Sequence, residues 1–234
     1  MNIEENYLNR KNMLLNYMTE AGATEKEKRE TLLFLNTIKS NNIPQKIPSF
    51  FKENKEFNIS YFSSGYLFRV LLQNECFYGI ATQKNCQTIA QKTKGKKILE
   101  VASGRGWLAK GITESGGQIK ATDDKSWFTE HEELCEIEHI DAEEAVKKYK
   151  NEYDILLISW PDTDDTAFKC IKEWGDKKDI IFIGEIGGCT ADHNFAQNFK
   201  INETAPYEKI SNDIRENIYI GKSTYSKLKK KNKP

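Results

Sequence analysis

The first third of the chain has the hydrophobic pattern of helices. Apolar residues recur every three or four positions over residues 3–18, and Gly22 follows where a left-handed residue would end a helix. Thr24 and Glu27 have the spacing of a capping box, in which a hydroxyl and a carboxylate satisfy free backbone N–H groups. The pattern therefore predicts a first helix that ends near Gly22 and a second helix that ends near Lys39.

This helical pattern stops at two prolines, Pro44 and Pro48, and residues 49–58 then form a polar segment that contains three phenylalanines. We interpret the segment as a connector or a lid, and ordinary packing of its aromatic rings is the alternative. Residues 60–78 are apolar enough to be buried, and residues 82–93 can form one more short helix. Together these segments predict a helical cap at the N-terminus.

The hydrophobic pattern changes at Lys96, where short apolar runs begin to alternate with segments long enough for a helix. The runs cover residues 98–102, 118–122, 135–140, 153–160 and 179–186. Strands that alternate with helices indicate parallel βαβ units in a doubly wound sheet. Two later strand-like pieces, 199–203 and 217–221, predict an antiparallel edge. We therefore expect an α/β fold, divided into a helical cap or extension (1–94), a sheet domain (95–222) and a basic tail (223–234).

The charge of the chain is balanced in total but segregated along the sequence. The 234 residues contain 35 Lys and Arg and 35 Asp and Glu, and this zero net charge argues against a protein that coats nucleic acid. Residues 130–144 contain eight acidic side chains and no Lys or Arg, whereas residues 222–234 contain six lysines and no acid. We interpret both blocks as solvated surface. The lysine tail leaves RNA, an anionic membrane or an acidic protein open as a partner.

Composition also bears on location and on metal binding. The longest apolar run is four residues, at 155–158, whereas a membrane span needs roughly 20. The acidic start lacks the basic region and apolar core of a secretion signal. The five cysteines are odd in number and include no C-x-x-C pair. We therefore expect a cytoplasmic chain with reduced thiols, without a membrane span and without a metal site, and of undetermined oligomeric state.

The most informative segment is residues 98–109, where an apolar strand runs into a turn with Gly104 and Gly106 and then into a helix. Glycines let the backbone pass close under a ligand, so the turn suits a nucleotide-like cofactor. Asp123 ends the next apolar run, 19 residues after Gly104, where a carboxylate can accept hydrogen bonds from ribose hydroxyls.

Two cofactors are compatible with this turn. Gly104-x-Gly106-x-x-Ala109 matches the G-x-G-x-x-G/A fingerprint of dinucleotide binding. Glu100 distinguishes the two, because a pyrophosphate on the turn would repel a nearby carboxylate. A cofactor with an ammonium group would instead use that carboxylate as a charge partner.

Glu100-x-Ala102-x-Gly104-x-Gly106 resembles the E/D-x-G-x-G-x-G first motif of class I methyltransferases, which use S-adenosylmethionine. The resemblance implies a seven-stranded Rossmann-like sheet that ends in an antiparallel strand pair. It also implies that Glu100 lies near the methionine end of the cofactor and that Asp123 holds the ribose. Ala102 replaces the first glycine of the motif, a change we expect to be tolerated if this residue keeps an extended backbone.

The resemblance extends over about residues 95–222. Residues 139–142 fall where the superfamily reads the adenine, through Asp141 and the adjacent backbone N–H of Ala142. Residues 153–162 resemble the fourth-strand motif, which ends beside the transferable methyl group. The cofactor-binding residues that the resemblance implies are Glu100, Ala102, Ser103, Gly104, Gly106, Trp107, Asp123, Asp141, Ala142, Ser159 and Trp160.

A narrower likeness is to a poorly characterised methyltransferase-like group with W-P-P-Y and G-G-C-T-G-D motifs. The counterparts here are Ser159-Trp160-Pro161-Asp162 and Gly187-Gly188-Cys189-Thr190-Ala191-Asp192. Asp162 and Thr163 replace the second proline and the aromatic residue, which stacks on the target in methyltransferases that act on bases. This departure weakens the hypothesis of nucleobase methylation.

Four polar residues at the ends of the fourth and fifth predicted strands are candidate catalytic residues: Ser159, Asp162, Glu185 and Asp192. Transfer from a sulfonium depends mainly on alignment and desolvation, and a polar side chain can orient the nucleophile or accept its proton. Alternatively, Asp162 lies in a solvated turn, Glu185 caps a loop and Asp192 caps a helix. From the helical cap, we expect Tyr61, Tyr66 and Arg69 to reach the pocket.

The leading hypothesis is a methyltransferase-like protein that binds S-adenosylmethionine and methylates an N or O nucleophile of a small molecule or a protein. A non-catalytic module that binds S-adenosylmethionine is the second hypothesis, and an NAD(P)-dependent oxidoreductase is the third. Nucleic acid is not favoured as the acceptor.

Overall fold

The computed structural model describes residues 3–52, 58–127, 131–210 and 214–225. Its helices are α1 (Ile3–Glu20), α2 (Glu25–Lys39), α3 (Ile59–Gln73), α4 (Gln83–Lys92), α5 (Trp107–Glu114), α6 (Ala142–Tyr149), α7 (Thr166–Trp174) and α8 (His193–Asn198), with a short 3-10 helix η1 (Ser49–Phe51). Its strands are β1 (Lys97–Val101), β2 (Gln118–Asp123), β3 (Ile137–His139), β4 (Ile155–Ser159), β5 (Asp179–Gly184), β6 (Phe199–Ala205) and β7 (Asn217–Ser223).

The strands form one seven-stranded sheet in the order β3-β2-β1-β4-β5-β7-β6. Neighbouring strands among β1 to β5 are parallel, and β7 is antiparallel to both β5 and β6. The predicted α/β fold, with a seven-stranded Rossmann-like sheet and an antiparallel edge, is thereby confirmed. The strand order reverses between β1 and β4, and open α/β sheets bind ligands at the carboxyl ends of the strands beside such a point.

Successive strand residues point to two different cores, one on each face of the sheet. Ile98 and Leu157 belong to the core that contains the N-terminal helices, α4 and α5. Leu99 and Leu156 belong to the core that contains α6, α7 and α8. Because both faces are covered, β4 and β5 each contain four consecutive apolar residues, and β1 is apolar apart from Lys97 and the buried Glu100.

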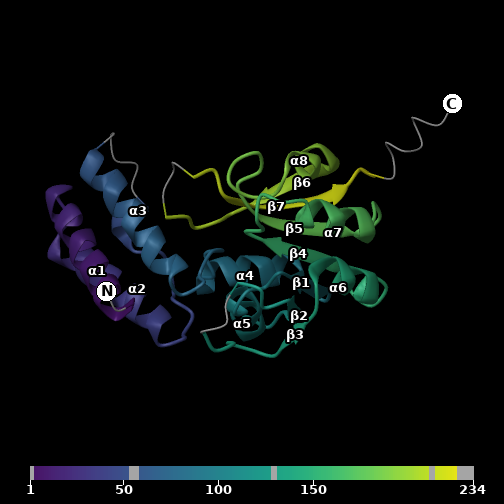
Figure 1. The fold of residues 1–234 in the computed structure, drawn as a ribbon, viewed down its shortest axis with the longest axis horizontal. Coiled ribbons are helices and arrows are strands. Elements are labelled where there is room, and N and C mark those ends of the chain that lie inside the picture. The colour runs from purple at the N-terminus through teal and green to yellow at the C-terminus, as the bar shows by residue number, and fades with distance from the viewer. Residues whose placement is uncertain (1–2, 53–57, 128–130, 211–213, 226–234) are drawn as a thin grey trace.

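The N-terminal helices dock on the sheet through a shared core. Figure 1 shows α1, α2 and α3 grouped at one side of the molecule, away from α6, α7 and α8. Leu14 of α1 and Phe68 of α3 belong to the same buried cluster as Ile98 and Ile181 of the sheet. The predicted helical cap is therefore present and continuous with the sheet in its packing, and a domain boundary at residues 94 and 95 stays a prediction.

Local sequence signals set the ends of the first two helices. Gly22 has a left-handed backbone, with φ of 80°. The N–H of the next residue, Ala23, donates a hydrogen bond of 2.8 Å to the Met18 carbonyl. Thr24 and Glu27 form both hydrogen bonds of the predicted capping box. Both of these predictions are confirmed.

The aromatic rings of the connector pack into the core. Phe50 and Phe51 are buried, and Phe51 stacks on Phe68 with ring centroids 4.3 Å apart. For these two rings the structure therefore shows ordinary packing, which was the alternative to a lid. The third phenylalanine, Phe57, lies outside the described residues.

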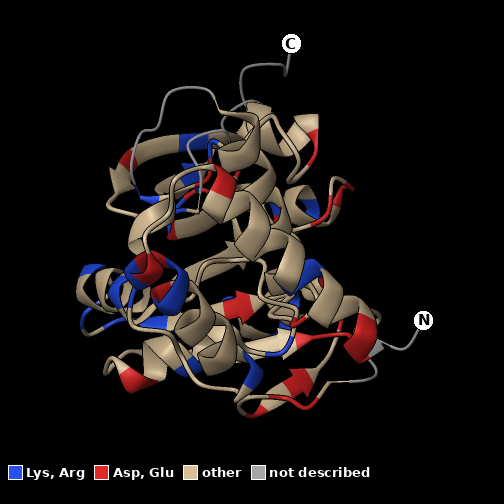
Figure 2. Ribbon diagram, turned by 90° about the vertical axis from the view of Figure 1, so that its left-hand side faces the viewer, with Lys and Arg blue, Asp and Glu red and all other residues tan. Residues whose placement is uncertain are grey.

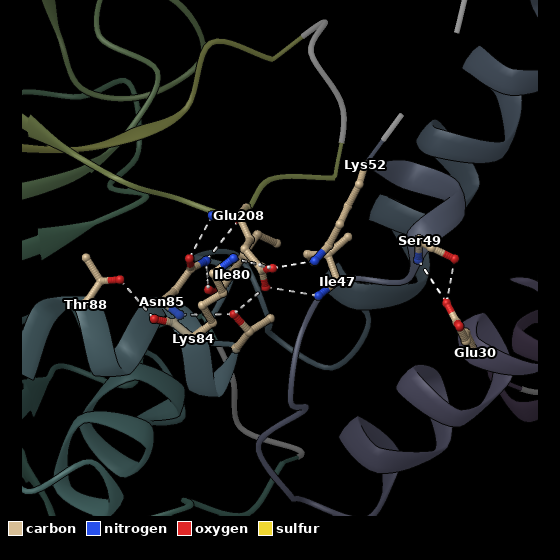
Figure 3. A network of polar contacts seen from close by, with 10 residues as sticks. Glu30, Ile47, Ser49, Lys52, Ile80, Lys84, Asn85, Thr88 and Glu208 are labelled. Carbon is tan, nitrogen blue, oxygen red and sulfur yellow. Dashed lines mark hydrogen bonds and ion pairs between the residues drawn. The ribbon is translucent and has the colours of Figure 1, made fainter. Parts of the chain in front are cut away.

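A polar network around Glu208, between β6 and β7, adds directed contacts to this docking (Figure 3). Its carboxylate accepts the Ile47 N–H over 3.2 Å and the Thr82 hydroxyl over 3.3 Å, and it pairs with Lys52 over 2.5 Å. The Glu208 N–H donates to the Asn85 side-chain carbonyl over 2.8 Å. These bonds fix the connector and the start of α4 against the loop that precedes β7.

Positions of Lys or Arg and of Asp or Glu are distributed over both helices and strands of the ribbon (Figure 2). Within the acidic block, Glu138 pairs with Lys120 and with Lys148, each over 2.7 Å, and Glu143 pairs with Lys147 over 2.8 Å. The lysines of the tail beyond residue 225 lie outside the described residues. None of the helices in the described ranges combines the length and the hydropathy of a membrane span.

Candidate functional site

A cavity of about 320 Å³ lies at the carboxyl ends of the parallel strands. Its walls come from the segments that follow four of these strands and from the segment between α3 and α4. The lining residues are Ala102 and Gly104 after β1, Asp123, Asp124, Ser126 and Trp127 at the end of β2, Asp141 and Ala142 after β3, Trp160, Pro161, Asp162, Asp164 and Thr166 after β4, and Cys76 and Tyr78 from the helical cap.

The glycine turn forms the floor of the cavity. Gly104 has φ of 56°, and a Cβ atom there would meet nothing within 4 Å, so the missing side chain leaves space for a ligand. Gly106 has φ of 85°, and a Cβ atom there would lie 2.6 Å from Cys135 Sγ. Gly106 is therefore required by packing against the segment before β3, while Gly104 faces the cavity.

Ala102 has the backbone conformation of a glycine. We expected alanine to be tolerated here if the residue kept an extended backbone, but Ala102 has φ of 51°, in the left-handed region that favours glycine. The condition is not met, because the chain turns immediately after β1. Alanine is accommodated at a cost in backbone strain.

Asp123, the last residue of β2, holds the glycine turn. Its carboxylate accepts the Gly104 N–H and the Lys125 N–H, each over 2.7 Å. The side chain is nevertheless part of the cavity wall. Burial raises the pKa of Asp123 above its usual value, and the two backbone N–H groups oppose this shift.

Glu100 lies beneath the turn and does not line the cavity. It is buried, one carboxylate oxygen has no hydrogen-bond partner among the described residues, and the Ala109 N–H donates to the group. Burial, with a smaller effect from the Asp123 charge, raises the pKa of Glu100 to about 8. In this structure Glu100 is therefore a buried acid beside the start of α5, where burial favours its protonated form.

Asp141 and Ala142 bring the start of α6 to the cavity. Asp141 is the N-cap and accepts the Glu143 N–H over 2.8 Å and the Glu144 N–H over 3.1 Å through one oxygen. Ala142 is the first helical residue, where the backbone N–H has no acceptor within the helix. A carboxylate oxygen and a backbone N–H therefore lie side by side at the wall.

Past the end of β4, Trp160 and Asp162 form the opposite wall. Trp160 has φ of 48°, and its backbone N–H donates to the Ile183 carbonyl over 2.7 Å. Asp162 differs from the other carboxylates of the cavity, because its side chain has no hydrogen-bond or ion-pair partner among the described residues. Tyr78 lines the same cavity as Asp162, and its pKa is raised by burial and further by Cys76 and Asp162.

Three predicted catalytic residues do not line the cavity among the described residues. Ser159 lies under the backbone of the helical cap, since a Cβ atom on Gly79 would be 2.3 Å from Ser159 Oγ. Glu185 caps its loop, accepting the Arg215 N–H over 3.1 Å and the Cys189 N–H over 3.3 Å. Asp192 caps α8, accepting the Phe195 N–H over 2.8 Å.

The predicted cofactor-binding residues also fall into two groups, those that line the cavity and those that do not. Ala102, Gly104, Asp123, Asp141, Ala142 and Trp160 line the cavity, whereas Glu100, Ser103, Gly106, Trp107 and Ser159 do not. Trp107, for example, is buried and donates its indole N–H to the Glu75 carbonyl over 3.0 Å.

The helical cap contributes residues that the sequence did not indicate. Cys76 and Tyr78 line the cavity, whereas Tyr61 donates to the Phe51 carbonyl and Tyr66 is 64% exposed. Arg69 is buried behind the wall rather than in it. Further along the chain, the lining residues Ser126, Trp127 and Thr166 were also not predicted, and no short motif singles them out.

The charge of the wall has one sign. Its charged side chains are the five aspartates Asp123, Asp124, Asp141, Asp162 and Asp164, and no Lys or Arg is among the described lining residues. Such a wall attracts cations and repels phosphates.

No protein-family model matches the chain, and the comparison with curated proteins found no match. Solved structures with a related arrangement include a variant of MtNAS, at 9% identity over 82% of this chain and 70% of that one, with a TM-score of 0.43. Magnesium protoporphyrin IX methyltransferase from Synechocystis PCC 6803 with bound SAM is 10% identical over 86% and 99% of the two chains, with a TM-score of 0.41. Human N-acetylserotonin methyltransferase in complex with SAM is 13% identical over 90% and 70%, with a TM-score of 0.40. Because these TM-scores lie below 0.5, the function has to be inferred from the chain's own residues.

Proposed function

We propose that this protein binds S-adenosylmethionine and transfers its methyl group to an N or O nucleophile of a small molecule or a protein. The observation that carries the proposal is the cavity at the strand ends, whose five charged side chains are all carboxylates. A cofactor with a sulfonium and an ammonium group suits this wall, whereas the pyrophosphate of a dinucleotide would be repelled by it.

Residues around the glycine turn fit the adenosine part of this cofactor. The open space over Gly104 leaves room for it, and Asp123 is placed to accept hydrogen bonds from ribose hydroxyls. Asp141 and the Ala142 N–H offer an acceptor and a donor, which suit the amino group and a ring nitrogen of adenine. Glu100 supports this surface from below.

The residues beyond β4 fit the acceptor end. When bound, the cofactor supplies a methyl group on a positively charged sulfur, so a neutral sulfide leaves. Asp162, whose carboxylate has no partner within the described ranges, orients the nucleophile and accepts its proton. Trp160 and Tyr78 form aromatic walls that limit the access of water to the reacting atoms.

A second candidate is a module that binds the cofactor without catalysis. It is favoured by the positions of Ser159, Glu185 and Asp192, which leave Asp162 as the remaining predicted catalytic residue at the wall. An oxidoreductase that uses NAD(P) is disfavoured by the acidic wall.

Isothermal titration calorimetry with S-adenosylmethionine, S-adenosylhomocysteine and NAD(H) tests the proposal. We expect saturable binding of both adenosyl ligands and none of NAD(H). Binding of NAD(H) alone would contradict the proposal. Turnover of labelled S-adenosylmethionine across amine and hydroxyl acceptors then separates an enzyme from a non-catalytic binder.

A further inference from the structure

Three side chains from distant parts of the sequence meet behind one wall of the cavity. The Arg69 guanidinium, from α3, lies over the Trp160 indole ring, 3.9 Å from its centroid. Glu216, which directly precedes β7, accepts the indole N–H of Trp160 over 2.9 Å. Arg69 and Glu216 pair with each other over 3.1 Å. The ring is thus held at its face by one charge and at its edge by the other.

The same pair also holds the second aromatic wall. Arg69 donates to the backbone carbonyl of Tyr78 over 3.3 Å. The Tyr207 hydroxyl lies 3.5 Å from Glu216 and accepts the Ile80 N–H over 2.9 Å, two residues beyond Tyr78. Both ends of the segment that carries Tyr78 therefore connect to the Arg69–Glu216 pair.

Burying the Arg69–Glu216 ion pair costs free energy, because both charges lose their hydration. Arg69 is 6% exposed and Glu216 is fully buried, and the Nε atom of Arg69 has no hydrogen-bond partner in the part of the chain that the structure describes. Burial raises the pKa of Glu216, and the Arg69 charge opposes this shift. Buried ion pairs contribute little net stability compared with apolar residues, but their hydrogen bonds fix geometry. Trp160 needs such fixing, because its left-handed backbone is a strained conformation.

We infer that Arg69 and Glu216 are positioning residues that hold Trp160 and Tyr78 as the aromatic walls of the cavity and so set its affinity for ligand. Through Arg69, the position of α3 in the helical cap then determines the shape of the site. The inference rests on the proposed function only for the identity of the ligand.

The chain offers a matched control for the test. Glu216→Gln keeps an oxygen that accepts the indole N–H but removes the charge that pairs with Arg69. Glu208→Gln makes the same substitution at another largely buried glutamate that ties the helical cap to the segment before β7, away from the cavity wall. Arg69→Lys is a milder second variant, because it keeps the charge and loses the flat group over the ring.

Two measurements are made on the full chain and on each variant. The emission of Trp160, obtained by subtracting the spectrum of the matching Trp160→Phe chain, reports the surroundings of the ring. Calorimetry with S-adenosylhomocysteine reports affinity. We expect Glu216→Gln and Arg69→Lys to change the Trp160 emission and to weaken binding about tenfold, and Glu208→Gln to change neither. In a Trp160→Phe background, Glu216→Gln should weaken binding much less, because the ring it positions is absent.

The inference is overturned if Glu216→Gln and Arg69→Lys leave the Trp160 emission unchanged, or if their effect on binding is the same with and without Trp160. It is also overturned if both variants fail to fold while Glu208→Gln folds, because the pair is then purely structural. If the wild-type chain does not bind S-adenosylhomocysteine, the proposed function fails, and the emission of Trp160 alone decides this inference.

Discussion

The backbone N–H of Gly104 donates a 2.7 Å hydrogen bond to the carboxylate of Asp123. This bond joins the turn after β1 to the end of β2 at the floor of the cavity. The second Asp123 oxygen accepts the Lys125 N–H, so the carboxylate shapes the site before any ligand is bound.

We predict that Asp123→Ala weakens the binding of S-adenosylhomocysteine by about 1 to 3 kcal/mol, because the turn loses its anchor and the ribose loses its acceptor. Asp154→Ala is the control, since Asp154 also accepts a backbone N–H, from Lys97 over 2.8 Å, but at the amino ends of the strands. Calorimetry on both variants measures the effect. Equal affinities for the two variants would mean that the pocket has been misplaced.

Asp162→Asn should lower the rate of methyl transfer by about 100-fold, because the carboxylate that accepts the proton of the nucleophile is removed. The affinity for S-adenosylhomocysteine should stay unchanged. The comparison is Asp165→Asn, three residues along, where the carboxylate pairs with Lys169 on the surface and does not line the cavity. Single-turnover rates that are equal for the two variants would remove Asp162 from the mechanism.

Ala102→Gly should stabilise the chain by about 0.5 to 1 kcal/mol. Glycine relieves the left-handed strain at Ala102, which costs roughly 1 to 2 kcal/mol. Glycine also increases the conformational entropy of the unfolded chain, which offsets part of this stabilisation. Urea denaturation measures the difference. A loss of stability would show that the alanine side chain makes packing contacts that outweigh the strain.

Glu100 should make the stability of the protein depend on pH. The unfolded chain releases this proton near the ordinary value of 4.5, whereas burial raises the pKa of Glu100 in the folded chain to about 8. Between these values the folded state holds one more proton, so stability falls as pH rises, by on the order of 1 kcal/mol per pH unit. Glu100→Gln cannot titrate, so the wild type should lose stability relative to this variant from pH 5 to pH 8.

Urea denaturation at several pH values measures this difference between the wild type and Glu100→Gln. Glu114→Gln, at an exposed glutamate, should follow the wild-type curve throughout. Parallel curves for Glu100→Gln and the wild type would contradict a buried acid beneath the turn.

The fold could be predicted from the sequence because the two signals that indicate it, apolar runs and helix caps, are local in the chain. Short apolar runs marked the strands of the parallel part of the sheet, and the capping box at Thr24 and Glu27 marked the start of α2. The third strand was predicted over residues 135–140 but spans only Ile137–His139, because polar residues blur the ends of a short strand near the sheet edge.

The site was only partly readable, because motifs give positions in sequence and not the direction of a side chain. Asp123 and Asp141 follow strands directly, and they do line the cavity. Glu185 and Asp192 also come after a strand, but their carboxylates accept hydrogen bonds from nearby backbone N–H groups. These local donors turn the two side chains away from the cavity. Tyr78 is in the wall because of how the helical cap packs, and no local pattern encodes such a long-range contact.

The central claim, that S-adenosylmethionine occupies the acidic cavity, is tested most directly by a crystal structure of the wild-type chain with S-adenosylhomocysteine. We predict that the ribose hydroxyls contact Asp123, that the adenine lies beside Asp141 and Ala142, and that the sulfur faces Asp162. A ligand bound elsewhere on the chain, or no ligand in the cavity at saturating concentration, would contradict the claim.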